Sequence, residues 1–173
     1  MSIVIPATHR SRDRLYVLFF LSYIPVIIFF DSLPLWPSGL APNNLLSLHK
    51  WYKNHFNDQL VITQPAWFRL FTLTEPFYQL PVAAWGIWAL RSKSLKAPAH
   101  LLLWAALTFG TTITCLFEFW HNQLMSEQEK LVLIAMYSSY AVIFGVIGVD
   151  MFCRIQKILA AAAGSVEQAK KSR

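Results

Sequence analysis

The sequence predicts an all-α membrane protein in which a bundle of four helices crosses the bilayer. Of its 173 residues, 55% are hydrophobic and only 14% are charged, whereas a soluble domain carries about 25% charged residues. The apolar residues are gathered into four long blocks, each near the roughly 20 residues that a membrane-spanning helix needs. The basic residues fall mainly on one side of such a layout, so we expect both termini in the cytosol.

The first apolar block, residues 15–30, follows a polar leader, residues 1–13, and reaches spanning length with residues 31–35. No small-residue cleavage site follows this block, so we interpret it as a retained span and not as a signal peptide. Pro25 lies inside the block. It is expected to bend the helix, because proline lacks a backbone N–H donor.

A moderately polar loop, residues 36–64, separates the first two spans. Within it, residues 44–56 alternate aromatic and basic side chains, which favours a short lumenal helix at the membrane interface. Two interpretations of this helix stay open. It could be a lid over a pocket, or it could serve only as an interfacial anchor.

Three further spans are predicted at residues 66–90, 98–119 and 131–153. Residues 14–158 then form one membrane domain, without internal repeats. The tail, residues 159–173, is rich in alanine and then polar, and we expect it to fray.

The placement of basic residues sets the predicted orientation, because cytosolic segments of membrane proteins are enriched in Lys and Arg. All three segments on the predicted cytosolic side agree. Lys170 and Lys171, the fourth and third residues from the end, also match a dilysine retrieval signal of endoplasmic-reticulum membrane proteins. Such a signal is an address read by a receptor and works on a cytosolic tail. The basic residues on this side are Arg10, Arg12, Arg14, Arg91, Lys93, Lys96, Arg154, Lys157, Lys170, Lys171 and Arg173.

Among the acids within predicted spans, Asp31 and Glu75 lie on the first two, where an unpaired charge costs at least a few kcal/mol. With a helix rise of about 1.5 Å per residue, Asp31 lies about 25 Å above Arg14, and Glu75 lies about 22 Å above Leu90. The two acids are thus at a similar depth on consecutive, antiparallel helices. In a low dielectric they cannot both ionise easily, so one is expected to keep its proton and donate a hydrogen bond to the other.

Pro76 and Pro81 support a polar cavity beside this pair, because each removes a helix hydrogen bond and frees a carbonyl, which membrane proteins tolerate where it lines a cavity. Gln79 is one helical turn from Glu75 and is expected to point the same way. The pair then suits an amphipathic cation or a polar lipid head, such as a sterol hydroxyl. The alternative is a hydrogen bond that only locks two helices together.

Other chemistry is not indicated. The sequence holds no P-loop, nucleophile elbow, zinc spacing or dinucleotide fingerprint, so we expect no cofactor, metal or nucleic acid. Cys115 and Cys153 both sit in apolar blocks and form no disulfide framework.

Several stretches stand in a distinctive order and spacing from about residue 15 to 155. They are Tyr23-Ile-Pro25 with Phe30-Asp31, Leu48-His-Lys-Trp51-Tyr52, Pro65-Ala-Trp67-Phe68, Glu75 with Phe77-Tyr78-Gln79-Leu80-Pro81, Leu116-Phe117-Glu118 and Tyr137-Ser-Ser-Tyr140. In these stretches the chain resembles the sigma-2 receptor (transmembrane protein 97) family of the EXPERA-domain superfamily, which also holds the emopamil-binding sterol isomerases.

The resemblance implies a four-helix, multi-pass protein of the endoplasmic-reticulum membrane, often a homodimer, with a lipid-accessible pocket and a link to sterol handling, including cholesterol. By that resemblance Asp31 pairs with a ligand amine and Glu75 hydrogen-bonds to Asp31, Asp58 is structural, and Gln79, Trp51, Tyr52 and Tyr140 line or approach the pocket.

The resemblance leaves three functions open. The first is a non-catalytic protein that binds a sterol or another amphipathic ligand. The second comes from the fungal branch, which includes the efficient-mitochondria-targeting-associated protein and implies a role in quality control or trafficking of precursors. The third is a sterol isomerase, which the chain disfavours because it places no histidine deep inside the predicted spans; His100 is at the cytosolic start of the third.

Overall fold

The computed structural model describes the backbone of residues 7–37 and 39–171, and the side chains of residues 11–37 and 39–165. The described residues form helices joined by short turns, with no strand, so the all-α class is confirmed. The elements are α1 (Ala7–Val26), η1 (Ile27–Asp31), η2 (Leu33–Leu35), α2 (Asn43–Phe56), α3 (Gln59–Thr63), α4 (Ala66–Thr74), η3 (Glu75–Gln79), α5 (Leu80–Arg91), α6 (Ala97–His121) and α7 (Glu127–Lys171).

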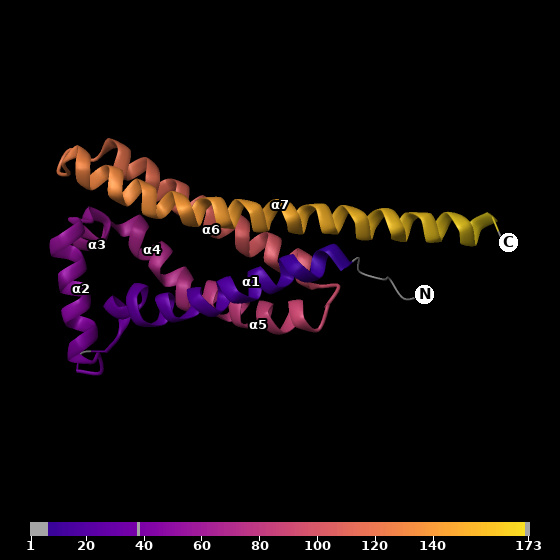
Figure 1. The fold of residues 1–173 in the computed structure, drawn as a ribbon, viewed down its shortest axis with the longest axis horizontal. Coiled ribbons are helices and arrows are strands. Elements are labelled where there is room, and N and C mark those ends of the chain that lie inside the picture. The colour runs from indigo at the N-terminus through magenta and orange to yellow at the C-terminus, as the bar shows by residue number, and fades with distance from the viewer. Residues whose placement is uncertain (1–6, 38, 172–173) are drawn as a thin grey trace.

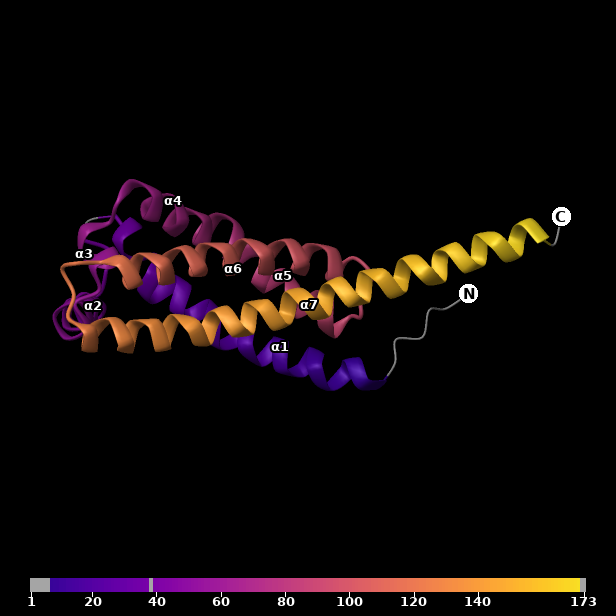
Figure 2. The same cartoon turned by 90° about the horizontal axis from the view of Figure 1, so that it is seen from above.

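The long helices run side by side, and a short helical corner closes one end of the bundle (Figure 1). The start of α1, the α5–α6 connection and the C-terminal half of α7 lie toward one end. The α6–α7 connection, α2 and α3 lie at the other, where α2 runs across the bundle axis (Figures 1 and 2). The short helix predicted at residues 44–56 is therefore confirmed as α2.

Within the described residues, three helical stretches are long and apolar enough to cross a membrane: Ser11–Asp31, Ala97–His121 and Glu127–Ser165. Their outer faces are apolar as well, with Leu18 and Leu103 62% exposed and Val149 66% exposed. A water-soluble bundle would not expose so many large apolar side chains. The surface therefore fits a lipid environment.

The second predicted span, residues 66–90, is helical over its length but is not one regular helix. It consists of α4, the π-helical segment η3 and α5 in succession. In η3 the N–H of Leu80 donates to the carbonyl of Glu75, five residues earlier. Pro76 explains the change of pitch, because it removes a donor that a regular α-helix uses.

A second π-helical segment, η1, begins two residues after Pro25 and ends at Asp31. Here the N–H of Ser32 donates to the carbonyl of Ile27 at 2.8 Å, again across five residues. π-Turns inside helices are rare and are frequent at functional sites. Both predicted acids thus lie at the end of such a segment, Asp31 as the last residue of η1 and Glu75 as the first of η3.

The core of the bundle is built around Trp104 of α6, which is fully buried. Its ring packs edge-on against the rings of Phe20 (5.1 Å between centroids), Tyr23 (5.8 Å) and Phe144 (5.4 Å). These contacts join α1 and α7 to α6. Because lipid tails are as apolar as these side chains, such close packing is what holds helices together in a membrane.

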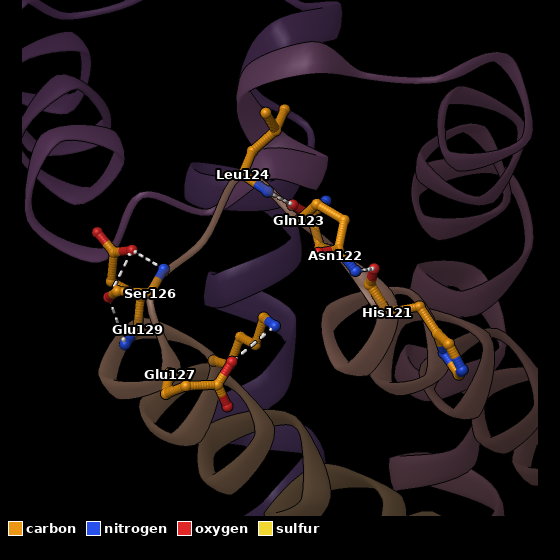
Figure 3. A network of polar contacts seen from close by, with 8 residues as sticks. His121, Asn122, Gln123, Leu124, Ser126, Glu127 and Glu129 are labelled. Atoms are coloured by element: carbon orange, nitrogen blue, oxygen red, sulfur yellow. Dashed lines mark hydrogen bonds and ion pairs between the residues drawn. The ribbon is translucent and has the colours of Figure 1, made fainter.

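The α6–α7 connection is held by side chains that complete the helix ends (Figure 3). The Ser126 hydroxyl accepts from the N–H of Glu129 at 3.3 Å, and the Glu129 carboxylate accepts from the N–H of Ser126 at 2.7 Å. This reciprocal capping box fixes where α7 begins. It gives the turn a defined geometry although Gln123, Leu124 and Ser126 are exposed.

At the opposite end, an ion cluster ties α1 to α7. Asp150 pairs with Arg154 one turn later at 2.7 Å and with Arg12 of α1. Arg154 also pairs with Asp13 at 2.6 Å. The side chains of Asp150 and Arg154 are only 6% and 10% exposed, so the cluster is partly shielded from water.

The tail differs from the expectation that it frays, because α7 continues to Lys171 and projects beyond the bundle (Figure 2). Alanine, glutamate, glutamine and lysine are strong helix formers, and no proline interrupts them. The proposed retrieval signal lies at this end. The side chains of Lys170 and Lys171 are outside the described part of the chain.

Candidate functional site

A cavity of about 580 Å³ opens between the helices near the end that α2 crosses. Its volume lies within the roughly 300–1,000 Å³ of typical ligand pockets. Most of its wall is aromatic or aliphatic, which favours an apolar ligand body. The lining side chains include Val26, Phe29, Phe30, Leu45, Leu48, Val61, Phe68, Phe71, Cys115, Met136, Tyr137 and Phe144.

Asp31 and Glu75 both line this cavity, from η1 and η3, which contact each other. One carboxylate oxygen of Glu75 (Oε2) is buried and has no hydrogen-bond partner in the described part of the chain. The structure shows no direct hydrogen bond between the two carboxyl groups among the described residues. The wall therefore presents two acids with capacity left for a ligand, and a shared proton between them remains a prediction.

Gln79, predicted to share the face of Glu75, lies behind the cavity wall. Its side-chain oxygen accepts from the hydroxyl of Tyr23 at 2.7 Å, and its amide nitrogen donates to the hydroxyl of Thr74 at 3.0 Å. Its backbone carbonyl accepts from the indole N–H of Trp104 at 3.1 Å. Because Tyr23 lines the cavity, Gln79 acts on it indirectly by fixing that ring.

Asp58 is completely buried and serves as the N-cap of α3. Its Oδ1 accepts from the N–H groups of Leu60 and Val61 at 3.0 and 3.2 Å. Its Oδ2 accepts from the hydroxyls of Tyr52 and Tyr137 at 2.9 and 3.2 Å. This carboxyl therefore joins α2, α3 and α7, an arrangement that fits the structural role expected for it.

Burial is the largest influence on the pKa of Asp58 and raises it above its usual value, while the four hydrogen bonds act in the opposite direction. The pKa of Tyr52 is raised for the same main reason, burial, and further by the neighbouring Asp58 carboxyl. The Tyr52 hydroxyl therefore keeps its proton. The hydroxyl acts as a hydrogen-bond donor in this cluster.

The aromatic residues predicted around the site separate into two groups. Tyr52 and Tyr140 line the cavity. Trp51 does not line it; its side chain is 53% exposed and stacks on His55 with 5.0 Å between ring centroids. Adjacent helix positions point about 100° apart, so Tyr52 and Trp51 cannot both face the cavity from α2.

Several cavity residues were missed by the sequence reasoning, among them His49 of α2. It lies one turn before Tyr52, and Leu45 and Leu48 line the cavity from the same helix. This helical spacing is the signal that could have found it. Tyr137, quoted above in the Tyr137-Ser-Ser-Tyr140 stretch, also lines the cavity and donates to Asp58.

Comparison with known proteins gives a consistent assignment. The family model for EXPERA (expanded EBP superfamily) matches residues 45–151, more than half of the chain. The proteins named sigma intracellular receptor 2 from Macaca fascicularis and Homo sapiens are each 33% identical to it, over 80% of this chain and 86% and 85% of theirs. Efficient mitochondria targeting-associated protein 19 of Schizosaccharomyces pombe is 28% identical over 91% of this chain and 84% of its own.

The matched residues contain Asp58, Glu75 and Tyr140, whereas Asp31 lies before them. The likeness to the receptors therefore rests on an alignment of most of both chains and not on a short motif. Together with the apolar helices, it shows that the chain is a membrane protein of the EXPERA family, related to sigma intracellular receptor 2 and to the fission-yeast mitochondria targeting-associated protein.

Proposed function

We propose that this protein is a non-catalytic binding protein that holds a sterol or an amphipathic cation in the cavity between its helices. The observation that carries the proposal is the pair of carboxyl side chains, Asp31 and Glu75, on the wall of an otherwise mostly apolar cavity of about 580 Å³. An apolar body with one polar or cationic group matches that wall. The name of the mammalian relatives, a receptor, supports a binding role.

The two acids have different tasks in this proposal. Two carboxyl groups close together in a low dielectric share one negative charge, because ionising both is costly. Asp31 lies nearer the loop and carries that charge against the ligand amine. Glu75 keeps its proton and donates a hydrogen bond to Asp31. A ligand hydroxyl, as in a sterol, would accept or donate at the same place.

The cavity belongs, in this proposal, to a four-span protein of the endoplasmic-reticulum membrane with both termini in the cytosol. Support comes from the basic residues: Arg12, Arg14, Arg91, Lys93 and Lys96 are at the bundle end where α1 starts and α5 meets α6. Positive charge favours the cytosolic side. The broken run α4–η3–α5 supplies the second pass. A homodimer is part of the same proposal.

Binding of a cationic amphiphile to the purified protein in lipid nanodiscs tests the function. We expect Asp31→Asn to abolish binding, because it removes the charge that pairs with the amine, and Glu75→Gln to weaken it. Glu118→Gln, an acid that does not line the cavity, is the matched control. Unchanged affinity in the Asp31→Asn protein would contradict the assignment.

A second function is favoured by the fission-yeast relative, which aligns with 91% of this chain and is named for mitochondrial targeting. In that case the protein acts in quality control or trafficking of precursor proteins. Crosslinking in membranes separates the two: protein clients that are still recovered with Asp31→Asn support a role independent of the cavity. Loss of those clients with the same variant supports a role that depends on it.

A further inference from the structure

The polar side chains on the cavity wall divide into groups that are already hydrogen-bonded and groups that are free. The hydroxyls of Tyr23, Tyr52 and Tyr137 donate to Gln79 and Asp58. Two threonines of the wall, Thr111 and Thr112, donate to the carbonyl of Thr108. Because these hydroxyls already donate within the protein, they shape the cavity but have no donor left for a ligand.

The groups left for a ligand include the acid pair and, on α2, the imidazole of His49. No hydrogen bond or ion pair of the His49 ring is present in the described part of the chain. The ring is half-buried and lies edge-on to Phe30, with 5.3 Å between centroids. His49 therefore contributes a polar group to the wall that is separate from Asp31 and Glu75.

We propose that His49 is a specificity-determining residue, whose imidazole hydrogen-bonds a second polar group of the ligand while the acid pair binds the first. This inference rests on the proposed function. A neutral imidazole offers one N–H donor and one nitrogen acceptor, and both suit a hydroxyl. The ligand class is then an amphiphile with polar groups at both ends: an amine or hydroxyl for the acids, and a hydroxyl for His49.

The physical reason is the cost of covering a polar group with an apolar ligand. When a ligand displaces water from His49 without replacing its hydrogen bonds, the imidazole is left unpaired, which costs about as much as a lost hydrogen bond. A ligand with a hydroxyl at that place avoids the cost. We expect discrimination on the order of tenfold between two such ligands.

The charge state of His49 adds a second expectation. Burial and the neighbouring Lys53 lower the pKa of its imidazole below the usual value, so the ring is neutral at pH 7. When it is protonated at lower pH, it adds a positive charge to the cavity and opposes a cationic ligand. The other titratable groups on the cavity wall are Tyr23 on α1, Asp31 on η1, Tyr52 on α2, Glu75 on η3, Cys115 on α6, and Tyr137 and Tyr140 on α7.

The test compares two probes, dodecyl-dimethylamine and its analogue with a hydroxyl at the far end of the chain, bound to the full protein in phosphatidylcholine nanodiscs. The flexible chain lets the hydroxyl reach His49 without a set distance. We expect the wild-type protein to prefer the hydroxylated probe about tenfold at pH 7.5, His49→Leu to lose that preference, and His49→Gln to keep part of it.

The same two probes also test the effect of the charge on His49. As the pH is lowered from 7.5 until the His49 ring is protonated, affinity for the plain amine should fall more in the wild type than in His49→Gln, because only the wild type gains a charge at this position. Thermal unfolding shows that each variant is folded. A hydroxyl preference and pH profile unchanged in both His49 variants overturn this inference alone. If neither amine binds the wild-type protein, the result contradicts the proposed function and, with it, this inference.

Discussion

The buried carboxyl of Asp58 offers the sharpest test of what holds the cavity end of the bundle together. Replacing it by alanine removes the N-cap of α3, which costs about 0.5–2 kcal/mol. It also leaves the hydroxyls of Tyr52 and Tyr137 without their acceptor, at about 1–3 kcal/mol each when they stay buried. Since the hydroxyls can turn and recover part of this loss, we expect Asp58→Ala to destabilise the protein by roughly 3–6 kcal/mol.

Asp58→Asn is the matched control, because its side-chain oxygen can still cap α3 while its amide nitrogen donates to the two tyrosine oxygens. We expect a smaller cost, of about 1–2 kcal/mol. Thermal unfolding in detergent or nanodiscs measures both variants. For a chain of this size, at about 2–4 °C per kcal/mol, alanine should lower Tm by roughly 6–24 °C.

The reasoning would be refuted by an alanine variant as stable as the wild type, or by an asparagine variant as damaging as alanine. The first result would mean that α2, α3 and α7 do not depend on this carboxyl. The second would mean that its charge, and not its hydrogen bonds, is what matters. Ligand binding should fall in parallel with stability, because Tyr52 and Tyr137 both form part of the cavity wall.

Two further predictions concern other buried polar contacts. Trp104→Phe removes the N–H that donates to the Gln79 carbonyl, and thermal unfolding should show a loss of stability of about 1–3 kcal/mol. An unchanged stability would mean that this hydrogen bond does not stabilise the π-helical segment. Asp150→Ala removes the carboxylate that Arg12 and Arg154 share, and thermal unfolding should show a loss of stability of up to about 3–5 kcal/mol. The loss should be smaller in an Asp150→Ala, Arg154→Ala double variant. Equal losses in the two proteins would contradict the pairing.

Much of the fold followed from hydropathy alone. The observed α6 and the start of α7 agree with the predicted spans to within a few residues, and α2 agrees with the predicted interfacial helix. A membrane-spanning helix has to satisfy its backbone N–H and C=O groups with hydrogen bonds inside the helix. Length and apolar composition therefore determine such helices with little help from tertiary contacts.

The direction of individual side chains was harder to predict. Gln79 was placed beside Glu75 because residues four apart share a face of an α-helix. The intervening turn is π-helical, with hydrogen bonds across five residues, so four positions fall short of a full turn and Gln79 points into the core. Nothing in the local sequence except Pro76 signals that change of pitch.

The acid pair was the part of the site that sequence reasoning could approach from depth alone. A carboxylate within a span needs a partner or a polar cavity. Counting helix rise from Arg14 and Leu90 predicted a similar membrane depth for Asp31 and Glu75. His49 was not found this way. It lies in a connecting helix, whose orientation depends on how α2 packs across the bundle, and no periodicity of the spans carries that information.

The central claim is that Asp31 and Glu75 make this cavity a binding site for an amphipathic molecule. The most direct measurement is mass spectrometry of the lipids and sterols that co-purify with the protein, comparing the wild type with the Asp31→Asn, Glu75→Gln double variant. We predict a molecule with an apolar body and an amine or hydroxyl group that is bound by the wild type and absent from the folded double variant. The same molecules in the same amounts on both proteins would contradict the account.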